Sequence, residues 1–472
     1  MKTYQFDVVI VGSGPAGVHA AYPLIKAGLK VAIIDGGLDS KKQDKKLSDF
    51  LDVHFRETSN AYDLIKQSSY VFNKTYQLLK INSNIEIIQS LAKGGLSQQW
   101  HGISDFFSNK ELERIGLPSN EIQAEYKEIA KLIKLKLEGN LDYHAKALLK
   151  TAESKPNLKE KLYRVPLAFP YRTSSDIEYF KKFKNFTYIP NQLVFTVKDI
   201  KTCVKIESRS INKQSTLQTK AGYVILAAGS INTTRILLRS LNLFNYKTTF
   251  LTKAHYITAC MHPRTFLLRS SEKYLKKSGL GQLVIADKKI GKGVGAFFIQ
   301  LYRFNPLVIH KVLKHIPLPK IMALPLMSIF APFLMIADIR FAASESKKRF
   351  CRLLKDADKN DVLEISFQES LKEMKNHESE FVKISRQLNS LGLFPLKTVK
   401  DYTTSHYAGG VPYMKNPGKI SVNLNGRLHQ ANRIYVADSA SWRALPAKAP
   451  TLTIMANAAR IGKKVLAKLA LH

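Results

Sequence analysis

Cysteine is scarce in this chain of 472 residues. The three cysteines, Cys203, Cys260 and Cys351, lie far apart and form no CxxC pair. A disulfide framework or a zinc site built from thiolates needs more cysteines at closer spacing. We therefore expect reduced thiols, no bound metal and a cytoplasmic protein. Residues 6–11 already read as a strand that enters a glycine loop, so we expect no signal peptide.

Negative charge is also in short supply. Only 37 acidic residues face 73 lysines and arginines, which gives a formal net charge of +36. Such a charge favours nucleic acid, an anionic membrane or acidic metabolites as partners, or simply a lysine-rich solvated surface. The basic clusters at 40–46, 131–136 and 346–350 are separate, and aromatic residues do not interleave with them. That pattern disfavours nucleic-acid binding and leaves an anionic membrane surface as a candidate partner.

An uninterrupted membrane-spanning run is missing too, since a spanning helix needs ~20 apolar residues. The uncharged stretch at 321–337 is shorter and contains Pro325 and Pro332, which would kink a helix. Three lysines precede it and Arg340 follows it. Three interpretations stay open: a buried helix pair under a substrate-domain sheet, an interfacial segment that admits a lipophilic substrate from lipid, and, least favoured, a transmembrane helix. The interfacial interpretation places the protein on the inner face of the membrane.

The N-terminal segment 6–35 reads as strand, turn, helix and strand around the glycines of a GxGxxG motif. Gly12 permits the tight turn, Gly14 lets the backbone approach a pyrophosphate, and Gly17 lets the helix pack closely on the strand. The helix N-terminus offers free N–H groups to phosphates. Asp35 ends the second strand, where an acid meets a ribose hydroxyl. The motif predicts a dinucleotide and does not distinguish FAD from NAD.

Two further segments have the local features of ligand-binding loops. The segment at 85–102 contains the pair Gly94-Gly95, and paired glycines let the backbone approach a flat ligand. The segment at 223–240 runs from an apolar strand through Ala228-Gly229 into a helix. Taken alone, the first is also typical of an ordinary loop, and the second of any strand–helix unit in a parallel sheet.

The C-terminal region combines a histidine, an aspartate and a helix start. His406 lies in SHYAGG, and imidazole, with an ordinary pKa near ~6.5, can take a proton near neutral pH. Asp438 follows an apolar strand and could also cap the next turn. Pro450 and Thr451 begin the final helix, where the missing N–H of proline costs nothing.

Together these four segments resemble the glucose–methanol–choline (GMC) family of flavin oxidoreductases. They occur in that family's order and span nearly the whole chain. The resemblance implies an α/β fold: a glutathione-reductase-like, Rossmann-type FAD-binding domain with an inserted α+β substrate domain built on an antiparallel sheet. Some relatives tether the flavin through a histidine in the second loop. Gln99 takes that position here and His101 is out of register, so we expect noncovalent FAD.

The chain is long enough for two interleaved domains. We expect FAD-binding parts at 1–115 and 185–260, substrate-domain parts at 116–184 and 261–400, and a C-terminal active-site and FAD-binding segment at 401–472. The residues expected to contact FAD are Gly12, Gly14, Ala16, Gly17, Asp35, Gly94, Gly95, Ser97, Trp100, Ala228, Gly229, Asp438, Ser439, Pro450 and Thr451.

In this family a histidine takes the proton of the substrate alcohol while a hydride goes to flavin N5, and His406 matches that histidine. The counterpart of Asp438 binds the ribityl and pyrophosphate region. The helix start at Thr451 would stabilise negative charge on reduced flavin. One position departs from the family. Many members have Asn or His before the proline, and this chain has Ala449.

Loss of such a polar group typically costs ~3 kcal/mol of transition-state stabilisation. Alcohol oxidation by His406 alone, another oxidation such as C–C desaturation, and a substrate that brings its own polar group all stay open. We predict an FAD-dependent oxidoreductase that acts on the CH–OH group of a small molecule, with oxygen, a quinone or a protein as electron acceptor. The alternatives are an FAD-retaining lyase or decarboxylase and a degenerate membrane-associated flavoprotein without catalysis.

Overall fold

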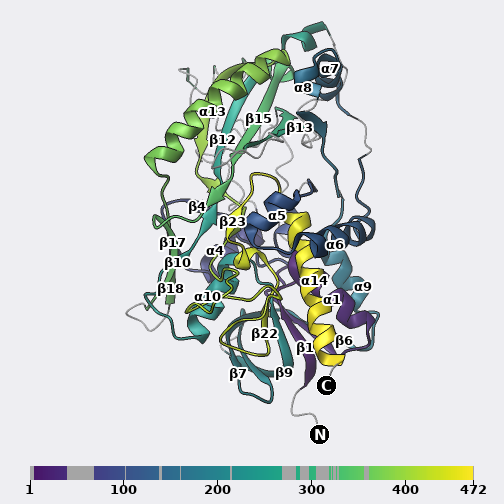
Figure 1. The fold of residues 1–472 in the computed structure, drawn as a ribbon, viewed down its shortest axis with the longest axis vertical. Helices are drawn as coiled ribbons and strands as arrows, with labels where there is room; N and C mark the ends of the chain where they lie inside the picture. Colours follow the sequence, from purple (N-terminus) through teal and green to yellow (C-terminus); the bar gives the residue numbers. More distant parts are fainter. Residues whose placement is uncertain are drawn as a thin grey trace.

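Two main sheets face each other across the middle of the molecule, one in the lower and one in the upper part of Figure 1. The computed structural model describes residues 5–39, 69–100, 102–137, 141–159, 161–168, 170–212, 215–267, 283–286, 297–304, 318–319, 322, 326, 329–355 and 361–470. His101 and residues 321, 323–325 and 327–328 of the stretch at 321–337 lie outside these ranges. The α/β class predicted from the sequence is confirmed.

The lower sheet is parallel at its centre. Its parallel strands, in spatial order, are β6 (Phe186–Ile189), β2 (Val31–Ile34), β1 (Phe6–Val11), β9 (Thr216–Leu226) and β22 (Ile434–Val436). The strands are apolar on both faces because both faces are covered. Val8 and Ile10 pack toward helices α1 (Pro15–Lys26) and α14 (Thr451–Ala470), and Val9 and Val11 pack toward the opposite face.

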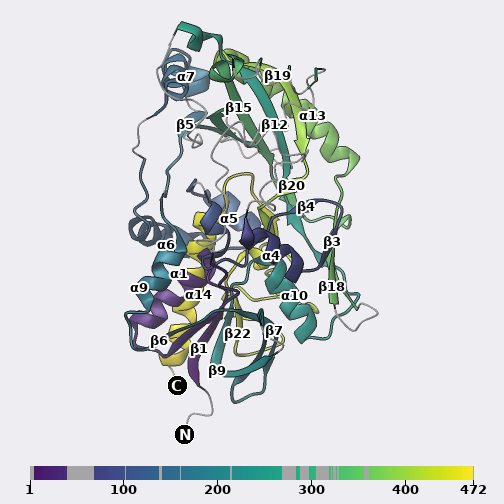
Figure 2. The same ribbon diagram turned by 180° about the vertical axis from the view of Figure 1, so that it is seen from behind.

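Helices α1 and α14 lie side by side in both views (Figures 1 and 2). Gly462 permits their close packing, since a Cβ there would lie 2.4 Å from the carbonyl oxygen of Ala20. At the start of α14, the N–H of Ile454 donates a hydrogen bond to the carbonyl of Pro450. This packing holds the start of α14 near the loop that follows β1.

An antiparallel meander extends the lower sheet. It consists of β7 (Gln192–Asp199), β8 (Val204–Ser210) and the first half of β9, which continues without a break into the parallel sheet. Helix α10 (Ser230–Ser240) follows β9 and packs on β7. The chain thus returns to the centre of the sheet before α10 begins.

The upper sheet is antiparallel throughout. Its order is β19 (Phe394–Asp401), β12 (Ala254–Met261), β15 (Leu334–Phe341), β14 (Phe297–Arg303), β13 (Leu283–Ala286) and β5 (Leu162–Arg164). Helix α13 (Leu371–Ser390) covers one face, with Ile384 and Leu388 against Ile339 and Phe341. Because strand side chains alternate, Gln300, Asp338 and Arg340 point to the other face.

Three segments join a different sheet or pack on a different helix from those expected from the domain boundaries that the sequence predicts. Strand β18 (Asp361–Phe367) falls in the predicted substrate part at 261–400, but it pairs with β17 (Arg349–Lys355) and β3 (Ile81–Ser83) in a separate sheet rather than joining the upper sheet. Strand β12 belongs to the antiparallel sheet, although residues 254–260 fall in a predicted FAD-binding part. Helix α6 (Ser119–Leu132) packs on α14, although it falls in a predicted substrate part.

The expectation of a buried helix pair at 321–337 is wrong for the end of that stretch. Residues 334–337 form the buried first half of β15, where both faces are covered and an apolar run therefore suits a strand. Among the described residues, no helix has the length and apolar character to cross a membrane. Cys203, Cys260 and Cys351 are buried free thiols.

Candidate active site

A cavity of about 790 Å³ is lined by residues of both main sheets. Fourteen of the sixteen predicted site residues line it: Gly12, Gly14, Ala16, Asp35, Gly95, Ser97, Trp100, Ala228, Gly229, His406, Asp438, Ser439, Pro450 and Thr451. Gly17 and Gly94 are not among the lining residues. Four segments that are distant in the sequence therefore meet at one site.

The first glycine loop has the geometry that its spacing predicts. Gly12 has φ +100°, and a Cβ there would lie 2.5 Å from the carbonyl oxygen of Ala227. A Cβ on Gly17 would lie 1.9 Å from the carbonyl oxygen of Gly12, so this glycine permits the helix to contact the strand. A Cβ on Gly14 meets no atom within 4 Å, because that position opens into the cavity.

The N-terminus of α1 is suited to an anionic ligand. Pro15 occupies its first turn, and no side chain caps it. Its free N–H groups therefore face the loop, and the helix dipole favours negative charge there. The second glycine loop lies against the first, since a Cβ on Gly95 would lie only 3.3 Å from the Cα of Gly14. These features fit a pyrophosphate.

Asp35 lies at the end of β2 and is held by neighbours. Its carboxylate accepts hydrogen bonds from Ser13 Oγ at 2.6 Å and Tyr188 Oη at 2.9 Å. Burial raises the pKa of Asp35, and these donors oppose that effect. The backbone N–H of Ser13 donates to the other carboxylate oxygen at 3.2 Å, and Asp35 lines the cavity, so a ribose hydroxyl there would compete with these donors for the carboxylate.

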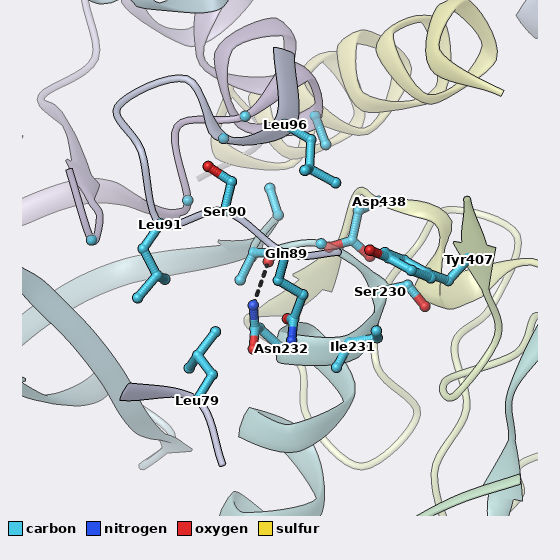
Figure 3. A pocket seen from close by; sticks show the side chains of 18 of the residues that line it. Leu79, Gln89, Ser90, Leu91, Leu96, Ser230, Ile231, Asn232, Tyr407 and Asp438 are labelled. Carbon is cyan, nitrogen blue, oxygen red and sulfur yellow. Dashed lines mark hydrogen bonds between the residues drawn. The ribbon is translucent and has the colours of Figure 1, made fainter. Parts of the chain in front are cut away.

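Other lining residues were not predicted. Gln89, Ser90 and Leu91 line the cavity, and Figure 3 shows Ser90 and Leu91 to the left of Ser230 and Asp438. Residues 192–194 also line it, and the N–H of Gln192 donates to the carbonyl of Asp35 at 3.0 Å. These positions have no motif, because backbone groups and apolar side chains of many types can serve there.

In the second glycine loop, the Ser97 hydroxyl bonds to groups of the protein. Ser97 Oγ donates to the carbonyl of Gly94 at 2.7 Å and lies 2.9 Å from Thr173 Oγ1. Gln99 and Trp100 line the cavity. Gln99 has no nucleophilic nitrogen for a covalent link to flavin, which supports the prediction of a noncovalent cofactor.

Asp438 both lines the cavity and caps a turn. Its carboxylate accepts from Thr233 Oγ1 at 2.5 Å and from the N–H of Ala440 at 2.9 Å, at the start of the short helix Ser439–Ser441. Burial raises the pKa of Asp438 to about 6. Asp438 and Tyr407 point toward the cavity near the start of α10 (Figure 3). The predicted cap is therefore confirmed, and the side chain also faces the ligand space.

His406 contacts Arg340, which the sequence analysis placed only at the end of the apolar stretch. Arg340 Nη1 lies 2.8 Å from His406 Nδ1, and both residues line the cavity. Arg340 also donates from Nε and Nη2 to the two carboxylate oxygens of Asp338, at 2.9 and 3.1 Å. Its interpretation as a basic flank at a membrane is wrong, because alternation along β15 turns it into the cavity.

The surroundings of His406 keep its imidazole neutral. Burial lowers the pKa of His406 well below its ordinary value, and the positive charges of Lys253 and Arg340 lower it further. Since a guanidinium only donates, Nδ1 accepts from Arg340 and the neutral ring carries its proton on Nε2. Lys253 Nζ donates to the carbonyls of Ala447 and Lys448, at 3.0 and 2.6 Å, and so anchors the chain that leads into α14.

Ala449 lies in the cavity wall and packs in an apolar cluster with Phe298, Val284 and Ala286. Neighbouring polar residues do not replace the missing group. Lys448 Nζ points away to the carbonyl of Phe106 at 3.0 Å. Asn457 is buried beside Tyr413 and Arg460 and is absent from the cavity lining.

Comparison with known proteins adds to this geometry. Residues 7–41 match an FAD binding domain, and residues 348–458 match a family described as GMC oxidoreductase. The glycine loop, the uncapped helix start and the first match define an FAD-binding flavoprotein. The second match contains His406, Asp438 and Thr451, and the two matches together support a flavoprotein of the GMC oxidoreductase type.

Curated relatives match only parts of the chain. Thiamine thiazole synthase of Pyrococcus abyssi is 30% identical over 113 residues, which cover 20% of this chain and 45% of that protein. Soluble pyridine nucleotide transhydrogenase of Stutzerimonas stutzeri is 57% identical over 35 residues, 7% of this chain and 8% of that protein. The chain spans less than half the length of these relatives, so their activities are not transferred to it.

Proposed function

We propose that this protein is an FAD-dependent oxidoreductase that oxidises the CH–OH group of a small molecule. One observation carries the proposal: His406 and the start of α14 line the same cavity as the two glycine loops. Bound FAD supplies a hydride acceptor. The protein's own residues must therefore hold the substrate, accept its hydroxyl proton and stabilise negative charge.

The first loop and the N-terminus of α1 would hold the pyrophosphate, and Asp35 would hold the ribose. Asp438 would bind the ribityl region. The N-terminus of α14 begins at Thr451 in the cavity wall, and its partial positive charge would stabilise the reduced ring.

His406 is proposed as the proton acceptor. Its lowered pKa keeps the ring neutral at neutral pH, as a base requires. Its Nδ1 accepts from Arg340, and Nε2 carries the ring proton. Transfer of a substrate proton to His406 therefore requires Arg340 to release Nδ1.

The test is anaerobic reduction of the purified flavoprotein by a panel of alcohols, sugars and hydroxylated lipids, followed by absorbance. We expect one class to bleach the flavin. His406→Asn, which still offers an acceptor to Arg340, should keep the flavin spectrum and slow bleaching by roughly 10²–10⁴-fold. Product formation without bleaching would instead indicate the lyase alternative, and protein purified without flavin would overturn the proposal.

We also propose peripheral contact with an anionic membrane near the apolar stretch. Its described residues Met322 and Ile329 are 59% and 65% exposed, and Leu326 and Phe330 are also exposed. Exposed apolar side chains beside lysines are typical of interfacial segments. Such contact would suit a lipophilic substrate.

A further inference from the structure

Gln300 is a buried amide that faces the cavity. It lies on β14, is 7% exposed and lines the cavity together with Arg340 and His406. Its side chain makes no hydrogen bond to any residue that the structure describes. An amide that faces a cavity offers both donors and an acceptor to a ligand bound there. A ligand in the cavity would supply the missing partner.

Arg340 lines the same cavity as Gln300 and has N–H groups that make no hydrogen bond to Asp338 or His406. A guanidinium carries five N–H groups, and the contacts to Asp338 and His406 use three of them. Asp338 stays ionised, because Arg340 and His255 outweigh the effect of burial and hold its pKa well below the usual range. The two-pronged contact with Asp338 therefore fixes the Nε and Nη2 side of Arg340, and Nη1 is the end that can change partners.

Ala449 offers no substitute for the second polar group of the family. It lines the cavity and packs against Phe298 and Val284 in an apolar cluster. The polar end of the cavity thus consists of Gln300, Arg340 and His406, from strands β14 and β15 and the loop before Tyr407. The first two present donors to an oxygen.

We propose that Gln300 and Arg340 orient the substrate and select one with a carbonyl or carboxylate oxygen beside the hydroxyl group that is oxidised. Arg340 turns Nη1 from His406 to this oxygen, and Gln300 donates its amide N–H to the same group. The substrate hydroxyl replaces Arg340 as the donor to His406 Nδ1. On oxidation Nδ1 of His406 would accept the hydroxyl proton, and FAD, when bound, would supply the acceptor for the C–H hydride, so atoms and charges balance.

This inference rests on the proposed function and deepens it. It explains how a chain with Ala449 could still oxidise alcohols, since the substrate brings the polar group and the upper sheet recognises it. It also gives the Arg340–His406 contact a role: His406 becomes a proton acceptor only when a matching substrate displaces Arg340.

The test compares three matched series at several chain lengths: 2-hydroxy acids, their methyl esters and the secondary alcohols without the carboxyl group. In anaerobic and steady-state assays we expect kcat/KM for the acids or esters to exceed that of the matching alcohols by ~100-fold or more. Gln300→Leu should raise KM for the preferred series by ~10-fold or more, with unchanged flavin content. Arg340→Lys keeps the charge but loses the fork, and it should remove most of the preference.

Ile299→Val is the matched control, since Ile299 neighbours Gln300 on β14 and packs on the opposite face. It should leave both KM and the preference unchanged. Bleaching with equal kcat/KM for all series, or a Gln300→Leu enzyme with unaltered KM, would overturn this inference and leave the proposed function standing. If no alcohol of any series or of the wider panel bleaches the flavin, both fail together.

Discussion

Single glycines show most directly how this sequence determines its structure. Gly14 and Gly17 stand three residues apart in one motif and serve opposite purposes. A Cβ on Gly14 would enter empty space in the cavity, and a Cβ on Gly17 would collide with backbone 1.9 Å away. One glycine is therefore needed for the ligand and the other for the fold.

We predict that Gly14→Ala folds with near wild-type stability when flavin is absent and binds FAD at least ~10-fold more weakly. Gly17→Ala should lose ~1–3 kcal/mol or more of stability, because the contact is with backbone that cannot move aside. Urea unfolding of flavin-stripped protein and flavin titration separate the two effects. Equal flavin affinity of wild type and Gly14→Ala would contradict the assignment of this loop to the pyrophosphate.

His406 marks the limit of reasoning from single residues. The motif predicted a histidine at the site, and the structure places it in the cavity wall. Its partner Arg340 lies 66 positions away, on a strand that the sequence suggested only as an apolar run. The contact exists because alternation along β15 turns Arg340 toward the loop of His406.

At the scale of elements, a buried ion cluster ties α10 to β18. Asp361 accepts from Arg235 at 2.8 Å and from Arg239 at 2.6 Å, with all three side chains largely buried. Arg235 and Arg239 lie one helical turn apart, so one carboxylate contacts both guanidinium groups, and the cluster keeps a net positive charge. The cluster joins the helix that begins at the cavity to the sheet beside it.

We predict that Asp361→Asn lowers the free energy of unfolding by about 3–5 kcal/mol, because it leaves two buried arginines unpaired. Arg239 and Arg235 outweigh burial and lower the pKa of Asp361 in the folded state. Its contribution is therefore present above the unfolded pKa of ~3.9 and is lost as pH falls through the folded pKa.

Urea unfolding at pH 7 and at decreasing pH below 4 measures this contribution. The difference between wild type and Asp361→Asn should shrink as the pH falls. Glu364→Gln is the control on the same strand: its pair with Arg352 is more exposed, and we expect a change within about 1 kcal/mol. Equal effects of the two substitutions would show that the cluster is not a special source of stability.

Elements were predictable where local patterns suffice. The β1–α1–β2 unit followed from apolar runs and glycine spacing, and the start of α14 from Pro450. The pairing of β18 and the strand at 334–337 were not, because a short apolar run suits a buried helix and a buried strand equally. Only the partner strands resolve that choice.

At the scale of the whole molecule, the charge and the exposed apolar residues give a testable property. We predict that the protein floats with vesicles that contain anionic lipid at low salt, floats less at high salt, and does not float with neutral vesicles. Ile329→Ser with Phe330→Ser should weaken flotation. Leu424→Ser, at a residue 60% exposed elsewhere, is the control. Protein that stays in the dense fraction with anionic vesicles would rule out this contact.

The sequence by itself determined the cofactor loops, His406, Asp438 and the helix start, because each depends on local requirements: a left-handed glycine, a missing Cβ, a proline in a first turn or a titratable ring. The tertiary structure alone decided what surrounds them. Gln300, Arg340 and Lys253 belong to no motif, and their roles arise from strand alternation and from contacts between distant segments. Backbone geometry is encoded within a few residues, whereas the electrostatic environment of a buried histidine is the sum of charges brought together by folding.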